Sequence, residues 1–318
     1  HSIQIVMTHA KDFLTNPWLT AIRLHTLPAI IAPIFLGTCI AFHDGILHPT
    51  AVVVIVACAL LIQIGTNLAN DYYDALNSVD TPDRTGFVRA TASGLIPPTH
   101  MKRAWIFVFS IAVLLGFYLL YLGGLPILLI GLLSIAAGIL YTGGPYPFGY
   151  HGLGDLFVFI FFGIIAVTGT YYIQAVATLS YFPLWFPPGT ITTMSLIASI
   201  SMASLTTSIL VVNNIRDMET DEKAGKITLS IYLGKFWSKM EYLFLILLAF
   251  VPPIYFYIFL NFPKTVLLPL LVSPYAISLV YLVLSDPTPP SFNKILKHTT
   301  FLTLFFSILF GFGIFNPF

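Results

Sequence analysis

Long runs of apolar residues alternate with shorter polar stretches along this 318-residue chain. A helix needs roughly 20 mostly apolar residues, within a range of about 17–25, to cross a lipid bilayer. Lipid cannot satisfy backbone hydrogen bonds, and runs of this length are wrong for tilted barrel strands, so the runs predict helices. Nine runs qualify, at about 18–42, 50–70, 104–122, 125–141, 156–176, 189–212, 242–260, 265–285 and 298–316. The pattern predicts an all-α polytopic membrane protein, with about nine transmembrane helices around a central cavity in a single domain, 1–318.

The composition supports a membrane location. Hydrophobic residues make up 57% of the chain and charged residues only 8%, whereas a soluble domain carries roughly 25% charged residues. The net charge of +1 offers no basic surface for nucleic acid, so no nucleic acid is expected as a partner. Cys39 and Cys58 lack the spacing of metal ligands and are expected to be small core residues. No apolar run with a cleavage site follows His1, so no signal peptide is expected.

The basic residues predict how the chain is oriented. With alternating loops, 12 of the 14 Lys and Arg residues fall on the side of the membrane that holds residues 1–17. Arg23 lies within the first run, and Lys264 alone falls on the opposite side. The positive-inside rule makes the basic side cytoplasmic. The two longest hydrophilic stretches, 71–103 and 213–241, both lie on it, so we expect the active site at the cytoplasmic face.

Two acidic motifs stand where an apolar run ends on this face. If the second run continues as a helix, residues spaced by three and four positions share one face of it: Asn67, Asn70, Asp71 and Asp74. Asp80 and Arg84 follow in the same stretch. The end of the sixth run carries a similar group: Asn213, Asn214, Arg216, Asp217, Asp221 and Lys226. The matched placement favours two four-helix halves, about 18–141 and 156–285, with a ninth helix at about 298–316.

The cost of these carboxylates near lipid favours a bound cation. A carboxylate near the bilayer centre costs on the order of 2.5–3.5 kcal/mol, and repulsion between carboxylates grows as the dielectric falls. Oxygen ligands from Asp and Asn suit Mg²⁺, which keeps some waters and shares phosphate oxygens with a substrate. The interleaved Arg84, Arg216 and Lys226 supply donors for a diphosphate. The alternative is that both motifs are ordinary solvated helix ends.

These motifs resemble those of the UbiA-type membrane prenyltransferases, whose hallmarks are NDxxDxxxD and a later DxxxD. Asn70, Asp71 and Asp74 match the first motif, and Asp217 and Asp221 match the second. The expected nine-span layout extends the resemblance over nearly the whole chain.

One departure points to a branch of that family. The last Asp of the first motif would fall at Ser78, whereas this sequence offers Asp80 two residues later. That longer spacing resembles the dihydroxynaphthoate polyprenyltransferase branch, which makes the menaquinone or phylloquinone skeleton. The segments 146–150, 152–155 and 225–229 resemble it as well.

The resemblance implies an Mg²⁺-dependent aromatic prenyltransferase that is integral to the membrane. A polyprenyl diphosphate would lose diphosphate, and the prenyl chain would join dihydroxynaphthoate at its carboxyl-bearing carbon with loss of CO₂, giving a demethylmenaquinone-type product. The implied metal ligands are Asp71, Asp74, Asp80, Asp217 and Asp221. The implied catalytic residues are Asp71, Asp74, Asp217, Asp221 and Lys226. The implied diphosphate ligands are Asn70, Arg84, Asn214, Arg216 and Lys226.

The acceptor would lie against a second group of residues: Arg23, Tyr141 and Asp155. For each of these a structural role is an open alternative. Arg23 could extend to the interface, Tyr141 could belong to an interfacial aromatic belt, and Asp155 could cap the fifth helix. Two other functions also stay open, namely a related prenyltransferase with another aromatic acceptor and a membrane transporter. No pattern in the sequence predicts an oligomeric state.

Overall fold

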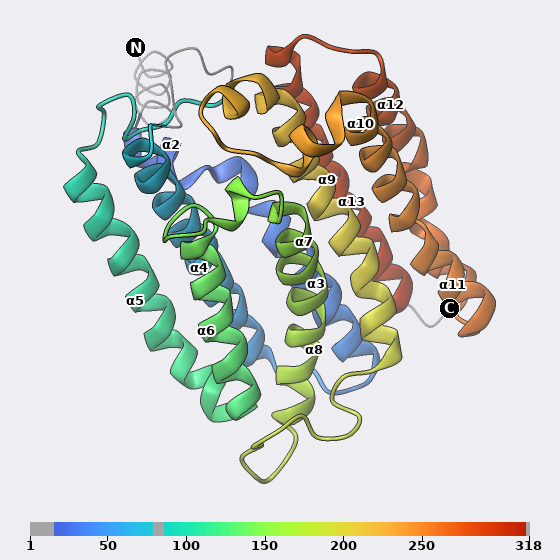
Figure 1. The fold of residues 1–318 in the computed structure, drawn as a ribbon. Helices are drawn as coiled ribbons and strands as arrows, with labels where there is room; N and C mark the ends of the chain where they lie inside the picture. The colour runs from blue at the N-terminus through green and yellow to red at the C-terminus, as the bar shows by residue number, and fades with distance from the viewer. Residues whose placement is uncertain (1–15, 79–85, 316–318) are drawn as a thin grey trace, which may run out of the picture.

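The computed structural model describes residues 16–78 and 86–315, so Asp80 and Arg84 lie outside the described residues. Within them, helices pack side by side into one bundle (Figure 1). In chain order the elements are α2 (Pro17–Ile22), η1 (Leu24–Thr26), α3 (Pro28–His43), α4 (Pro49–Leu76), α5 (Pro98–Gly123), α6 (Leu125–Leu140), η2 (Phe148–Tyr150), α7 (Gly154–Val158), η3 (Phe159–Ile165), α8 (Ala166–Val176), α9 (Thr193–Lys223), α10 (Leu229–Ala249), α11 (Val251–Phe259), η4 (Lys264–Val272), α12 (Ser273–Leu284), η5 (Pro289–Ser291) and α13 (Phe292–Phe315).

The lengths of these helices confirm a polytopic membrane protein. Joined where they are continuous, the described helices give seven that are long and apolar enough to cross a membrane. The bent pair formed by residues 17–26 and 28–43 is an eighth candidate, and α6 is a shorter apolar helix. Each of the nine predicted runs therefore corresponds to one helical path through the bundle, although the paths differ in length.

The first predicted span, 18–42, is broken instead of continuous. α2 ends at Ile22, because the next residue, Arg23, has left-handed backbone angles (φ 57°, ψ 60°) that cannot continue a right-handed helix. α3 then starts at Pro28, where the missing N–H of proline has no helical partner to lose. The two pieces meet at a bend of 43°. This break brings Arg23 and Thr26 to the wall of a central cavity.

α4 and α9 extend beyond their apolar parts and carry the two acidic motifs. α4 continues to Leu76 and α9 to Lys223, so the predicted hydrophilic stretches 71–103 and 213–241 both begin as helix. These ends stay helical because their acidic side chains are buried and have partners inside the protein. The prediction that the first motif continues the second helix is confirmed.

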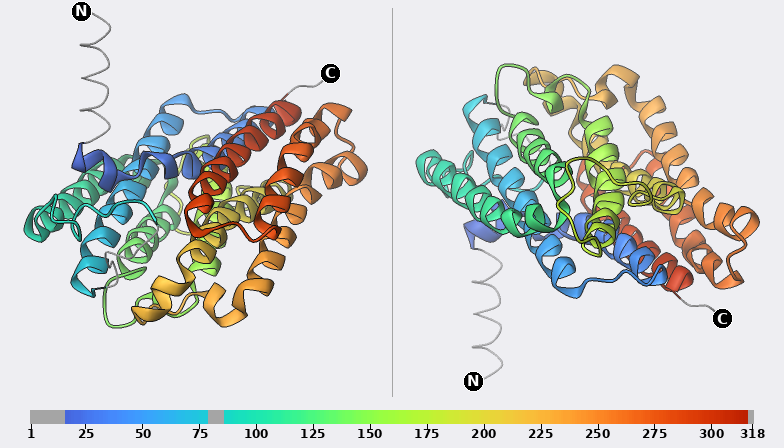
Figure 2. Two further views of the ribbon diagram at one scale, coloured as in Figure 1. Left: turned by 90° about the horizontal axis from the view of Figure 1, so that it is seen from above. Right: turned by 90° about the horizontal axis from the view of Figure 1, so that it is seen from below.

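α9 lies at the centre of the bundle. In its most apolar part 78% of the residues are buried, compared with 22% for the peripheral α5. Small and hydroxyl-bearing residues let its neighbours approach closely: the Ser201 hydroxyl donates to the Ala249 carbonyl of α10 at 2.7 Å. Figure 2 shows α3 beside α13, where the Ser307 hydroxyl donates to the Ala32 carbonyl. Segments far apart in the sequence thus build one core.

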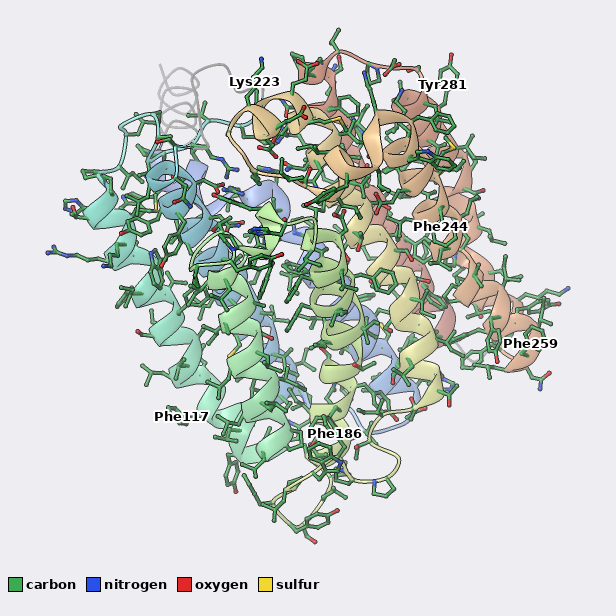
Figure 3. All side chains as sticks on the ribbon, viewed as in Figure 1. Phe117, Phe186, Lys223, Phe244, Phe259 and Tyr281 are labelled. Carbon is green, nitrogen blue, oxygen red and sulfur yellow. The ribbon has the colours of Figure 1, made fainter. Side chains whose placement is uncertain are left out.

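The outer surface of the bundle is apolar over most of its height. Large side chains project from it (Figure 3), including Phe117, Phe244 and Phe259, which are 59%, 60% and 65% exposed. An apolar surface of this extent is costly in water. It is the surface expected of an integral, multi-pass membrane protein, whose solvent is lipid.

We expect Gly163→Ala to destabilise the protein. A Cβ at Gly163 would lie 2.1 Å from the Cα of Ala203, so η3 and α9 would have to move apart. Overpacking of this kind costs about 1–3 kcal/mol, which in thermal denaturation in detergent corresponds to a Tm lower by about 3–10 °C. The matched control is Gly169→Ala, since a Cβ there meets only a side-chain carbon of Ile165 at 3.9 Å. Equal Tm values for the two variants would contradict this account of the packing.

Candidate active site

A cavity of about 580 Å³ lies inside the bundle, between α3, α4, α5, α6, α8 and α9. Where α4 and α9 end, its wall is polar, with Asn70, Asp74, Asn214 and Lys226 among its residues. Further along, the wall is apolar and comes largely from α5 and α6, with Phe117, Leu120, Ile127, Leu128 and Leu132. The predicted central cavity is confirmed, and its polarity changes from one end to the other.

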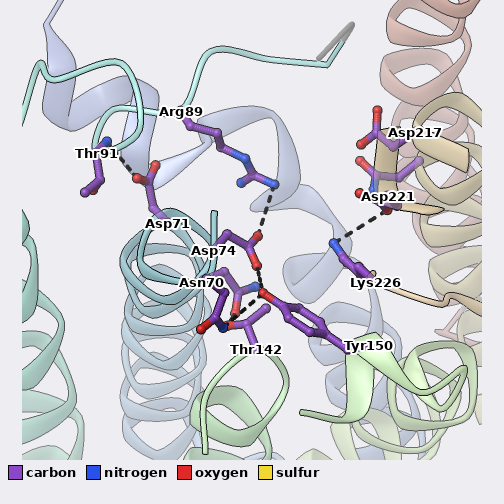
Figure 4. Close-up of polar contacts among 12 residues, drawn as sticks. Asn70, Asp71, Asp74, Arg89, Thr91, Thr142, Tyr150, Asp217, Asp221 and Lys226 are labelled. Carbon is purple, nitrogen blue, oxygen red and sulfur yellow. Dashed lines mark hydrogen bonds and ion pairs between the residues drawn. The ribbon is translucent and has the colours of Figure 1, made fainter. Parts of the chain in front are cut away.

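Three residues of the first motif line this cavity, namely Asn67, Asn70 and Asp74. Asp74 is 1% exposed, and its carboxylate accepts a hydrogen bond from the Tyr150 hydroxyl at 2.6 Å. Nη2 of Arg89 lies 3.8 Å from the same carboxylate. The side-chain oxygen of Asn70 accepts a hydrogen bond from the Thr142 hydroxyl at 2.8 Å (Figure 4). Asn70 and Asp74 of α4 therefore present side-chain oxygen atoms to the polar end of the cavity.

Asp71 takes a different direction from the same helix. Its two carboxylate oxygens accept hydrogen bonds from the backbone N–H groups of Ala90 and Thr91, at 3.1 and 2.8 Å. The side chain is 1% exposed and is not part of the cavity wall. The carboxylate predicted as a metal ligand is thus engaged with the loop that follows α4.

The second motif is organised by the turn that ends α9. Gly225 adopts φ 75°, and the Lys226 N–H donates to the Asp221 carbonyl at 2.9 Å, which is a common way to close a helix with glycine in the left-handed region. The turn brings the Lys226 ammonium to 3.6 Å from the Asp221 carboxylate. Both side chains are buried, so the ion pair is formed away from bulk water.

Asp217 is paired within its own motif. Nε and Nη2 of Arg216 each donate to one oxygen of the Asp217 carboxylate, both at 2.7 Å. The guanidinium also donates to the side chains of Asn213 and Asn293, which ties α9 to α13. Arg216 does line the cavity, but its guanidinium already serves three side chains.

Tyr150 connects the two motifs and was missed in the sequence. Its hydroxyl binds Asp74 of α4, and the Lys226 ammonium lies 5.7 Å from the centre of its ring, close enough for a cation–π contact. The Ile227 N–H donates to the Tyr150 carbonyl at 3.1 Å, which holds the loop after α6 against the turn after α9. The structure therefore brings the two acidic motifs, distant in sequence, to the same end of the cavity (Figure 4).

The residues predicted to bind the acceptor occupy different positions. Arg23 and Tyr141 line the cavity. The Tyr141 hydroxyl lies against Gly154, 2.8 Å from the position that a Cβ would take there, so the glycine makes room for it. Asp155 is 5% exposed and lies outside the cavity wall, and neither of its oxygens has a hydrogen-bond partner among the described residues. It is the second residue of α7, and the N-cap position of that helix is Leu153, which makes no side-chain capping hydrogen bond.

A second group surrounds Phe87, a residue that the sequence did not single out. The guanidinium of Arg216 and the ammonium of Lys297 each lie 5.6 Å from the centre of the Phe87 ring. The His25 ring lies 4.2 Å from it. Phe87, His25 and Arg216 all line the cavity. Phe87, His25 and Arg216 thus give the cavity wall a cationic and aromatic part.

The donor set suits a metal shared with a substrate. Among the described residues no three His, Cys, Asp or Glu side chains lie close enough together to hold a metal by themselves. The polar end of the cavity offers Asp74 and Asn70 from α4 and Asn214 from α9, with Asp221 beside Lys226. These are hard oxygen ligands, and Mg²⁺ is commonly held by one or two carboxylates together with substrate phosphates and water.

The structure therefore combines a helical bundle of membrane-spanning length with a largely apolar cavity and two acidic helix ends near its polar end. The chain belongs to the UbiA prenyltransferase family, whose model matches residues 30–314. The family resemblance predicted from the motifs is confirmed.

Curated relatives narrow the comparison. The chain is 33% identical over 315 residues to the 1,4-dihydroxy-2-naphthoate octaprenyltransferase of Escherichia coli, covering 97% of this chain and 98% of that protein. It is 37% identical over 227 residues to the protein of the same name from Mycobacterium tuberculosis, covering 71% and 72%. The fold is similar to that of a UbiA homolog from Archaeoglobus fulgidus bound to DMAPP and Mg²⁺, with a TM-score of 0.60 and 14% identity, covering 94% of this chain and 99% of that one.

Proposed function

We propose that the protein transfers a polyprenyl chain from a polyprenyl diphosphate to 1,4-dihydroxy-2-naphthoate in an Mg²⁺-dependent reaction. The observation that carries the proposal is the cavity, whose polar end gathers Asp74, Tyr150 and Lys226 while its length is apolar. The diphosphate fits the polar end and the prenyl chain fits the apolar length. The names of the curated relatives support the choice of acceptor.

The metal is expected to bind between the two motifs. Asp74 and Asp221 are the carboxylates best placed to hold it, with Asn70 and Asn214 beside them. Asp71 and Asp217 are left out of this proposed ligand set, because both oxygens of each carboxylate already accept hydrogen bonds from the protein. Bound Mg²⁺ supplies Lewis-acid stabilisation of the negative charge on the diphosphate. A UbiA homolog of the same fold binds both DMAPP and Mg²⁺, which supports a metal ion and a prenyl diphosphate as ligands of this protein.

The chain's own residues stabilise the departing diphosphate and protect what it leaves behind. As the C–O bond to the diphosphate breaks, the Lys226 ammonium lies where negative charge develops, in a buried site where such charges act strongly. The allylic carbon that becomes positive lies against aromatic rings, for which Tyr150 and Tyr141 are the candidates. The mostly apolar wall of the cavity keeps water away from this carbon, and water would otherwise quench the cation.

The acceptor attacks with the ring carbon that carries its carboxylate. A C–C bond forms to the prenyl chain, and the carboxylate leaves as CO₂, whose bonding electrons return to the ring and restore its aromaticity. Arg23, on the cavity wall, is the proposed partner of the acceptor carboxylate, because a guanidinium matches a carboxylate in shape and charge. Asp155 is kept as a proposed orienting residue near Tyr141. The expected excess of basic residues on one side supports a site at the cytoplasmic face.

The test uses the purified protein in nanodiscs with octaprenyl diphosphate, dihydroxynaphthoate and Mg²⁺, with the products analysed by mass spectrometry. We expect a prenylated naphthalenediol that has lost CO₂, and no product in the presence of EDTA. A parallel reaction uses 4-hydroxybenzoate as the acceptor. Product from hydroxybenzoate and none from dihydroxynaphthoate would refute the acceptor, and equal rates with and without EDTA would refute the metal.

Gly131→Phe is expected to restrict the length of the prenyl donor. Gly131 lines the apolar part of the cavity on α6, and a Cβ there meets no atom within 4 Å. The added ring would fill space that a long chain needs, so kcat/KM for octaprenyl diphosphate is expected to fall about tenfold or more, while geranyl diphosphate is used at nearly the normal rate. The control is Leu114→Phe, since Leu114 is 67% exposed on the outside of α5. Equal losses with both donors would mean that the chain lies elsewhere.

A further inference from the structure

The loop between α4 and α5 forms part of the cavity wall. Three consecutive residues of this loop, Phe87, Val88 and Arg89, line the cavity. The next two, Ala90 and Thr91, are buried. In Figure 4 the Arg89 side chain extends from this loop towards Asp74, on the side of the cavity that faces Lys226. The loop therefore covers the polar end of the cavity.

Asp71 is what fastens this loop to α4. Both of its carboxylate oxygens accept backbone N–H groups, from Ala90 at 3.1 Å and from Thr91 at 2.8 Å. Hydrogen bonds to an ionised carboxylate are stronger than those between neutral groups, and this one is 1% exposed. The two amides come immediately after the three cavity-lining residues. This pair of hydrogen bonds, the Asp71 clamp, therefore fixes the position of those three residues along the wall.

The clamp holds the Arg89 side chain at the polar end of the cavity. Its Nη2 lies 3.8 Å from the Asp74 carboxylate, and its side chain is 10% exposed. The planar guanidinium presents several N–H donors in a fixed fork, which matches the oxygens of a phosphate group. On the opposite side of the same polar end lies the Lys226 ammonium. A diphosphate between them would meet one cation from each half of the chain.

We propose that Arg89 is a ligand of the prenyl diphosphate and that Asp71 is a positioning residue, which holds the Arg89 loop through the Ala90 and Thr91 amides instead of binding the metal. This inference rests on the proposed function for the identity of the ligand. It assigns different tasks to Asp71 and Asp74, although both belong to one motif. Asp74 faces the cavity, and Asp71 faces the loop.

The first experiment measures hydrogen–deuterium exchange of the loop in the full-length protein. In Asp71→Asn one carboxylate oxygen becomes an NH₂ group, which cannot accept a backbone N–H. The amides of Ala90 and Thr91 are expected to exchange about tenfold faster or more, while the α9 amides are unchanged. The control is Asp44→Asn, since Asp44 ends α3 and accepts a hydrogen bond from the Tyr171 hydroxyl at 2.6 Å, away from this loop. An unchanged loop in Asp71→Asn would overturn the clamp.

The second experiment separates positioning from metal binding. Binding of a prenyl diphosphate and its dependence on Mg²⁺ are measured by titration for wild type, Asp71→Asn, Arg89→Ala and the double variant. Each single variant is expected to raise the Kd for the prenyl diphosphate about tenfold, with the Mg²⁺ half-saturation concentration within twofold of wild type. The double variant is expected to be no weaker than Arg89→Ala, because the clamp acts through Arg89.

Two results would overturn the proposal. A tenfold shift in Mg²⁺ half-saturation for Asp71→Asn would make Asp71 a metal ligand, and additive losses in the double variant would make the two residues independent. Because binding is measured without the acceptor, wild-type protein that binds the diphosphate but gives no naphthoate product would refute only the proposed reaction. Thermal denaturation checks that each variant is folded, and Arg89→Ala tests the ligand without disturbing the clamp.

Discussion

Asp74→Asn is expected to lower kcat/KM for prenyl transfer by a factor on the order of a thousand, in protein that remains folded. Asp74 is buried, faces the cavity and holds both the Tyr150 hydroxyl and the Arg89 guanidinium. The substitution preserves the size of the side chain but removes its negative charge, so it weakens the metal site and the positions of both partners. Losing a single preorganised electrostatic group already costs about a hundredfold to a thousandfold in rate. Initial rates of product formation measure the effect.

The control for Asp74→Asn is Asp44→Asn. Asp44 follows α3 and accepts a hydrogen bond from Tyr171, so its replacement removes a carboxylate without touching the cavity. Its activity is expected to stay within about twofold of wild type. The assignment of Asp74 fails if Asp74→Asn retains more than a tenth of the wild-type rate while both variants have the same thermal stability.

Lys226→Met is expected to lower the rate by about a hundredfold to a thousandfold. Methionine keeps the apolar stem but removes the ammonium, which lies 3.6 Å from the Asp221 carboxylate and above the Tyr150 ring. Without this charge the departing diphosphate loses its nearest protein cation on the α9 side. Inhibition by added inorganic diphosphate gives a second measurement, because the variant is expected to bind diphosphate more weakly. Lys226→Arg keeps the charge and is expected to recover part of the activity.

The matched control is Lys235→Met. Lys235 binds Asp286 at 2.7 Å on the surface, with both side chains more than half exposed, and surface pairs of this kind contribute only about 0–1 kcal/mol. The two lysines thus carry the same charge in different surroundings. If both variants kept wild-type rates and the same inhibition by diphosphate, Lys226 would have no role in binding the leaving group.

The helical scaffold could be predicted from the sequence because lipid imposes a simple rule. Each span needs a long apolar run, and such runs were visible for all nine paths. The exception is instructive: the apolar run 18–42 concealed the break at Arg23. A hydrophobicity pattern does not detect a single residue with left-handed backbone angles, although such a residue ends a right-handed helix. The break in the helix brings the side chains of Arg23 and Thr26 to the cavity wall.

The acidic motifs could be located from the sequence, but the direction of each carboxylate could not. Helical periodicity separates Asp71 and Asp74 by only about 60° around the axis, so both belong to one face. The partners that distinguish them lie outside the motif. Asp71 meets the Ala90 and Thr91 amides, and Asp74 meets Tyr150, 76 residues away in the sequence.

Loop residues were the least predictable part of the site. Tyr150 and Arg89 both lie outside the long helices, where no periodicity says which way a side chain points. Arg89 carried one available signal, since it is a basic residue within the hydrophilic stretch after the first motif. Tyr150 carried only its place in a segment that resembled the family branch. Its contact with both motifs depends on how the two loops meet.

The cavity wall changes from carboxylates and amides at one end to Phe117 and Leu128 further along. The protein therefore contains an internal boundary between a polar and an apolar environment. In the proposed reaction the polyprenyl diphosphate is split at that boundary into an ionic diphosphate and an apolar prenyl group. Each fragment is then left in surroundings that match its own solubility. Partitioning alone is therefore expected to separate the two products. The diphosphate would leave from the polar end, and the prenylated product would stay in the apolar part of the cavity.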